Sequence, residues 1–78
     1  MGYWNYRIVR YQDGSGHGLH EVYYAADGTP RLMTEGAAVF VAYAGETPAG
    51  IVASLERALK DAKERPVIDE IVSPRTTT

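Results

Sequence analysis

Both histidines of the sequence lie in one segment, QDGSGHGLHE, together with a serine and two acidic residues. Asp13, Ser15 and His17 have the residue types of a catalytic triad, but a glycine-rich loop gives them no rigid scaffold. His17 and His20 have only Glu21 beside them, which is too few ligands for a metal site. A strand follows the glycines, whereas phosphate-binding loops lead into a helix. We therefore expect surface or interface histidines, no catalytic, metal or cofactor site, and no enzyme.

The tyrosines and arginines give a different signal. Six tyrosines and one tryptophan are many aromatic residues for a chain of 78, and tyrosine beside arginine is typical of binding hot spots. Tyr23 and Tyr24 are adjacent, so they point to opposite faces of a strand and one of them lies away from any helix-covered face. The residues predicted to form a protein-binding surface are Tyr24, Tyr11, Arg7, Arg31 and Glu21. The same aromatic residues could instead fill a half-buried core or stack on single-stranded nucleic acid.

Composition narrows the class of protein. We expect a single domain over residues 1–72, followed by a disordered tail at 73–78. The sequence has no cysteine, so disulfides cannot stabilise so small a core and a homodimer is the expected support. A net charge of −2 argues against nucleic acid as a partner, since a broad basic surface is missing. Neither a secretion signal nor a membrane-spanning run is visible, which predicts a cytoplasmic protein.

The first half of the sequence reads as strands. Residues 3–11 and 19–26 are rich in aromatic and β-branched types, and the glycine-rich loop joins them. Alternation places Trp4, Tyr6 and Ile8 on one face, which we expect to be the core face. The dipeptide that follows the second strand, Asp-Gly, is a strong hairpin signal.

A third strand is expected at residues 31–35. The apolar run 37–44 fits either a separate strand or the far half of a bulged third strand. Residues 67–72 fit either a short last strand or an extended arm.

The second half of the sequence predicts one helix, from about Thr47 to Arg65. Thr47 is the expected N-cap, Pro48 suits the first helical position, and Pro66 stops the helix. Its apolar side is predicted to consist of Ile51, Val52, Leu55, Leu59 and Ala62. The fold class is therefore α+β: a two-layer β-β-β-α sandwich, in which a three- or four-stranded antiparallel sheet packs against one amphipathic helix.

Two resemblances accompany these patterns. The segments WNYRIVRY, LHEVYYAADGTP and GETPAGIVASLERALKDAKERPVID resemble a widespread group of short uncharacterised bacterial proteins. Three strands followed by Gly-Glu-Thr and a helix are also similar, over about residues 5–65, to HicB-like antitoxin domains. That resemblance implies a partial ribonuclease-H-like fold and the neutralisation of a small toxin ribonuclease by binding it.

Small acidic proteins without catalytic residues also occur among phage-encoded inhibitors, such as anti-CRISPR proteins. The sequence therefore predicts a non-catalytic protein-binding module, antitoxin-like or inhibitor-like, that occupies the surface of a toxin or of a nucleic-acid-handling machine. Single-stranded nucleic-acid binding through the strand tyrosines and arginines is the alternative.

Overall fold

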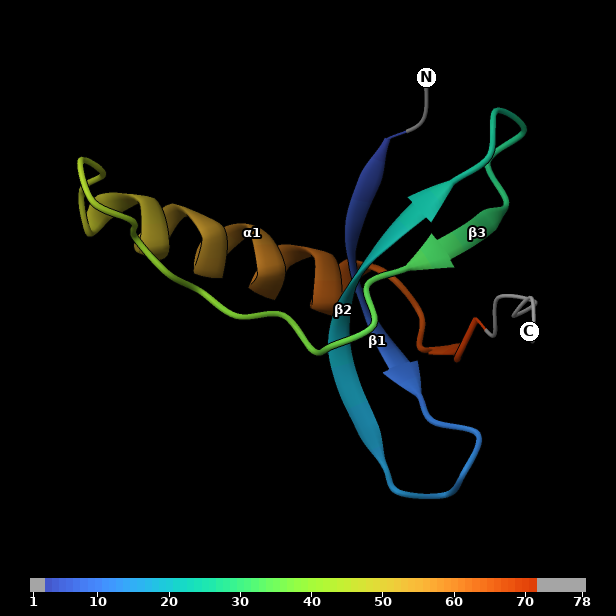
Figure 1. Cartoon of the computed structure of the whole chain (residues 1–78). Coiled ribbons are helices and arrows are strands. Elements are labelled where there is room, and N and C mark those ends of the chain that lie inside the picture. Colours follow the sequence, from blue (N-terminus) through green and yellow to red (C-terminus); the bar gives the residue numbers. More distant parts are fainter. Residues whose placement is uncertain (1–2, 72–78) are drawn as a thin grey trace, which may run out of the picture.

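A computed structural model of the chain describes residues 3–71 (Figure 1). Its elements are β1 (Trp4–Arg10), β2 (His17–Tyr24), β3 (Pro30–Met33), α1 (Ala49–Glu64) and β4 (Ile68–Asp69). A four-stranded sheet packs with one helix, which confirms the α+β class. Residue 72 and the predicted tail at 73–78 lie outside the described residues.

The strands lie in the order β3-β2-β1-β4. β1 pairs with β2, and β2 with β3, in antiparallel fashion, whereas β4 pairs with β1 in parallel. The sheet is therefore mixed rather than wholly antiparallel. The reason is that α1 returns the chain to the end of the sheet from which β1 started, so β4 enters in the direction of β1.

The turn after β2 has the expected chemistry. Gly28 adopts a φ of +89°, and its amide donates to the Ala25 carbonyl at 2.9 Å. Pro30 begins the edge strand β3, where a missing N–H is tolerated. Residues 37–44 form neither of the predicted strands. One backbone hydrogen bond, from the Ala38 amide to the Leu19 carbonyl at 2.7 Å, joins this segment to β2, and one such bond is too few to make a strand pairing.

The predicted core face of β1 is wrong. Tyr6 is buried, but Trp4 and Ile8 are only half-buried, whereas the alternate residues of the strand, Asn5, Arg7 and Val9, are all buried. The physical reason lies in the last described segment. Ile68 and Ile71 lie on the face away from α1, where they and Met33 pack against a buried cluster of Val9, Val22 and Tyr24.

The helix begins one residue later than predicted, at Ala49. Pro48 occupies the N-cap position and no side chain caps the first turn, so Thr47 is not the cap. At the other end the Arg65 amide donates to the Asp61 carbonyl at 3.0 Å, and Arg65 itself is extended before Pro66. The helix therefore ends where the proline predicts.

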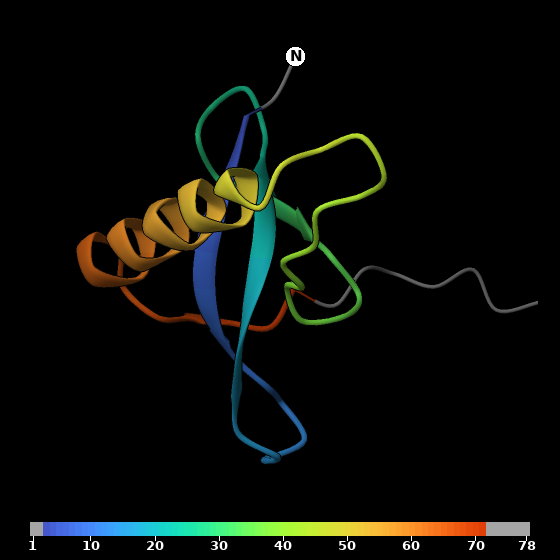
Figure 2. The same cartoon turned by 90° about the vertical axis from the view of Figure 1, so that its left-hand side faces the viewer.

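The helix also meets the sheet through another side than predicted. Figure 2 shows the helix crossing in front of β1 and β2, and Figure 1 shows that its C-terminal end lies near the sheet while its N-terminal end points away from it. Ala58 and Asp61 are its buried residues, while Val52, Leu55 and Leu59 stay largely exposed. Within residues 3–71, no helix combines the length and apolar character needed to cross a membrane.

Candidate protein-binding surface

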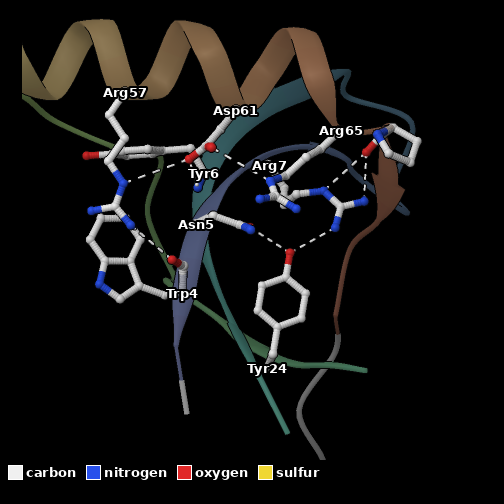
Figure 3. Close-up of polar contacts among 9 residues, drawn as sticks. Trp4, Asn5, Tyr6, Arg7, Tyr24, Arg57, Asp61 and Arg65 are labelled. Atoms are coloured by element: carbon white, nitrogen blue, oxygen red, sulfur yellow. Dashed lines mark hydrogen bonds and ion pairs between the residues drawn. The ribbon is translucent and has the colours of Figure 1, made fainter. Parts of the chain in front are cut away.

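The Arg7 side chain is buried on the face of the sheet that points away from α1. Its Nε and Nη2 atoms donate to the Pro66 carbonyl at 3.2 and 2.9 Å, and its Nη1 donates to the Tyr24 hydroxyl at 2.8 Å (Figure 3). A buried guanidinium is tolerated only when its donors find acceptors. Arg7 therefore ties β1 to β2 and to the segment after α1.

Asn5 and Arg65 extend this network. The Asn5 amide lies 2.6 Å from the Tyr24 hydroxyl. When its nitrogen donates to Tyr24, its oxygen accepts from Arg65 Nε at 2.9 Å, and this orientation satisfies both ends of the amide. Tyr24 and Arg7 are 7% and 8% exposed, so both serve the interior of the single chain.

His20 also belongs to the interior, contrary to the expectation of a surface or interface histidine. It is 1% exposed, its Nδ1 donates to the Thr34 carbonyl at 2.9 Å, and its Nε2 accepts from the Tyr11 hydroxyl at 2.7 Å. The carbonyl can only accept, which places the proton on Nδ1. Among residues 3–71 no three histidine or acidic side chains gather as metal ligands.

The five residues of the predicted surface do not form one patch. Tyr24, Arg7 and Tyr11 are held in the two networks above, on the face away from α1. Glu21 lies on the opposite face, where its Oε1 accepts from the Tyr23 hydroxyl at 2.7 Å, and Arg31 is exposed on edge strand β3. Their role in binding a protein stays a prediction.

A different set of residues is lined up on the helix side of the sheet. Trp4 pairs with Tyr23, and Tyr23 pairs with Leu32, so the three side chains form a row across β1, β2 and β3. We call this set the open row, because Tyr23 is 37% and Leu32 46% exposed beside the half-buried Trp4. The Trp4 and Tyr23 rings lie 6.3 Å apart.

Charged side chains hold the open row in place. The Arg57 guanidinium lies 4.0 Å from the Trp4 ring centroid, and its Nη2 donates to the Trp4 carbonyl at 3.0 Å (Figure 3). The hydrogen bond to Glu21 raises the pKa of Tyr23 above 10.0. Tyr23 is therefore a neutral hydrogen-bond donor at neutral pH.

Tyr6 lies beside the open row and carries the contact between sheet and helix. Its amide donates to Asp61 Oδ2 at 3.0 Å, and its ring lies 5.1 Å from the Trp4 ring and 5.9 Å from that of Phe40. Burial raises the pKa of the Tyr6 hydroxyl, and the Glu21 carboxylate raises it further. Tyr6 therefore packs against the open row from the interior and is not part of its exposed surface.

Sequence reasoning missed the open row for two reasons. From the sequence, Trp4 is expected in a closed core, and nothing singles out Leu32 among the residues of the third strand. The hairpin at Asp27-Gly28 fixes the register of β3 against β2, so it is the signal that could have placed Leu32 beside Tyr23.

A hollow of 340 Å³ lies between the loop before α1 and the first turns of the helix. It is lined by Val41, Ala42, Glu46, Thr47, Gly50 and Ser54. Glu46 is the single ionisable side chain of this lining, so the hollow holds no acid–base pair for catalysis.

Comparison with known proteins adds no relative: no family model, curated protein or solved structure matches the chain. Its function is therefore inferred from its own geometry.

Proposed function

We propose that this chain is a non-catalytic protein-binding module that occupies the surface of a partner protein through the open row. The observation that carries the proposal is the alignment of Trp4, Tyr23 and Leu32 across three strands, on a part of the sheet that leaves Tyr23 and Leu32 exposed. Aromatic anchors next to arginine are the composition of binding hot spots.

The setting of these residues favours binding over simple packing. The open row is carried by paired strands, and Arg57 and Glu21 already hold the two rings in position. Side chains that are ordered before binding lose less conformational entropy when a partner docks. The arginine and the glutamate also supply a polar edge around an apolar centre, as in most specific protein interfaces.

The partner class follows from the predicted function. An inhibitor-like or antitoxin-like module acts by covering a functional surface, so a toxin ribonuclease or another nucleic-acid-handling protein is the proposed partner. Nucleic acid itself is less favoured, because Tyr11 and Tyr24 make hydrogen bonds within the chain instead of offering free rings. The net charge of −2 also disfavours binding to nucleic acid.

Affinity purification of the tagged chain from its native host tests the proposal. We expect a protein partner that is retained by the wild type and lost by Tyr23→Ala and Leu32→Ser. Val39→Ser is the matched control, since Val39 is 77% exposed and lies outside the open row. With the partner purified, each row variant should raise Kd about tenfold or more.

Two outcomes would count against the proposal. One is partner binding that Val39→Ser weakens as much as the row variants do. The other is binding to a single-stranded oligonucleotide that falls steeply with salt and is lost in Tyr23→Ala, which would assign the row to nucleic acid.

A further inference from the structure

A second apolar surface lies on α1, well away from the open row. Val52, Leu55 and Leu59, which we call the helix stripe, are 56%, 48% and 57% exposed. Their spacing of three and four residues places them on one side of the helix. Contiguous exposed apolar side chains on a small protein mark an interaction site.

The helix stripe and the open row point in opposite directions. Arg57 lies against Trp4. Leu55 and Leu59 are each two residues from Arg57, which in an α-helix is a rotation of about 200°. A partner that docks on the open row therefore leaves the helix stripe uncovered, and the stripe needs an occupant of its own.

The charges along the stripe indicate what that occupant is. Glu56 flanks the first half of the stripe and Lys63 lies beyond its second half, on the same edge. Within the described part of the chain, neither of them forms an ion pair. A second copy of α1 packed antiparallel brings the acidic half of one helix to the basic half of the other, whereas parallel packing brings like charges together.

We infer that the helix stripe is the interface of a homodimer in which two α1 helices pack antiparallel about a twofold axis. Such an axis sets Leu55 against the partner's Leu59 and Val52 against the partner's Ala62. The same contact occurs twice, as a closed symmetric interface requires. Glu56 then reaches toward the partner's Lys63 on one edge, because helical side chains lean toward their own N-terminus.

Such a dimer would stabilise the fold, because the core of a single chain is small. Within residues 3–71 the buried apolar residues are Tyr6, Val9, Val22, Tyr24 and Ala58. A chain of 78 residues without cysteine has neither a large core nor a disulfide to stabilise it. Covering the stripe adds apolar burial to each copy without using the surface proposed to bind another protein.

Sedimentation of the purified full chain over a concentration series tests the inference. We expect a reversible monomer–dimer equilibrium for the wild type, and a dimer Kd raised about tenfold or more in the Leu55→Ala, Leu59→Ala double variant, because each dimer loses four leucines. Leu32→Ala is the control, since Leu32 is 46% exposed but lies in the open row. Circular dichroism verifies that each variant is folded.

Charge exchange tests the antiparallel arrangement separately. Glu56→Lys and Lys63→Glu should each weaken the dimer, and the double variant E56K/K63E should restore it, because the pair is then reversed. A double variant as weak as the single ones would overturn the antiparallel packing. A wild type that stays monomeric at millimolar concentration, or a dimer broken by Leu32→Ala instead, would overturn the stripe as a dimer interface.

A different occupant would also be recognised. A monomeric wild type whose complex with a purified foreign protein is broken by the Leu55→Ala, Leu59→Ala variant would assign the stripe to that protein and overturn the homodimer. Loss of the dimer with the open row still binding its partner would separate this inference from the proposed function.

Discussion

The two faces of the sheet differ in the residues that they carry and in how deeply those residues are buried. The face toward α1 carries Trp4, Tyr23 and Leu32, and two of these remain substantially exposed. The opposite face carries Arg7 and His20, which are almost completely buried. Among the described residues, no buried side-chain nitrogen or oxygen lacks a hydrogen-bond partner.

This difference shows that coverage, rather than hydrophobicity alone, decides which face becomes the interior. The segment after α1 closes over the face that carries Arg7 and His20, which we call the polar face, and supplies acceptors such as the Pro66 carbonyl. The helix meets the face that carries Trp4 and Tyr23, which we call the aromatic face, mainly at β1 and leaves the rest open. A strand face with charged residues can therefore be the core, provided that each polar atom is paired.

The largest expected effect tests how α1 is held on the aromatic face. Asp61→Ala removes the acceptor of the buried Tyr6 amide and a carboxylate that lies close to both Arg57 and Arg65. An unpaired buried donor is costly, so we expect the free energy of unfolding to fall by about 3 kcal/mol in urea denaturation. Asp61→Asn keeps an acceptor for the amide and should cost markedly less. Equal losses in the two variants would contradict this account.

The second prediction compares the faces through two adjacent tyrosines. Tyr24→Phe removes the hydroxyl bonded to Arg7 and Asn5 in the interior, and should lower the free energy of unfolding by about 2 kcal/mol. Tyr23→Phe removes only an exposed bond to Glu21 and should change it by less than about 0.5 kcal/mol. The two variants are compared by thermal and urea unfolding. A Tyr23→Phe variant as destabilised as Tyr24→Phe would remove the distinction between the faces.

A third, smaller effect is expected at Gly18 on the polar face. A side-chain carbon at this position would collide with the Tyr11 hydroxyl, which is bonded to His20. Gly18→Ala should therefore displace Tyr11 and cost about 1 kcal/mol, the worth of the lost hydrogen bond. In a Tyr11→Ala background the same substitution should cost much less, which a double-mutant cycle measures. If Gly18→Ala costs the same free energy in that background, the clash with the Tyr11 hydroxyl is not its cause.

The smallest effect lies outside both faces, in the two turns. Hydrogen bonds from Ser15 and Thr29 hold the pKa of Asp13 and Asp27 below 3.8 in the folded chain. These carboxylates therefore contribute stability at pH values above 3.8, and that contribution is lost as the pH falls through their lower folded pKa. NMR titration should show the pKa of Asp27 rising toward 3.8 in Thr29→Val. No rise would show that the hydroxyl does not act on the carboxylate.

The local elements were predictable because local chemistry determines them. Alternation marks β1 and β2, the Asp-Gly turn marks the hairpin, and Pro66 marks the end of α1. The buried face was not predictable, since it depends on where Ile68 and Ile71 return, almost sixty residues after β1. The pairing of Tyr11 with His20 depends in the same way on the register of two strands.

The helix side that meets the sheet was mispredicted for a related reason. An apolar stripe indicates what a helix buries, but it does not say whether the cover comes from the same chain. Here Asp61 is anchored to the Tyr6 amide, which turns the stripe away from the sheet. The prediction of an amphipathic helix was confirmed, whereas its docking side was not.

The parallel pairing of β4 with β1 has a consequence for how the chain is made. Val9 finds its partner Ile68 only after nearly the whole described chain has been synthesised, and the Arg7 contact to Pro66 spans 59 residues. Contacts between such distant residues form late and slow folding. On the ribosome, the core therefore cannot close over the Arg7 guanidinium before the segment around Pro66 and Ile68 has emerged, and we expect resistance to proteases to develop only at that point.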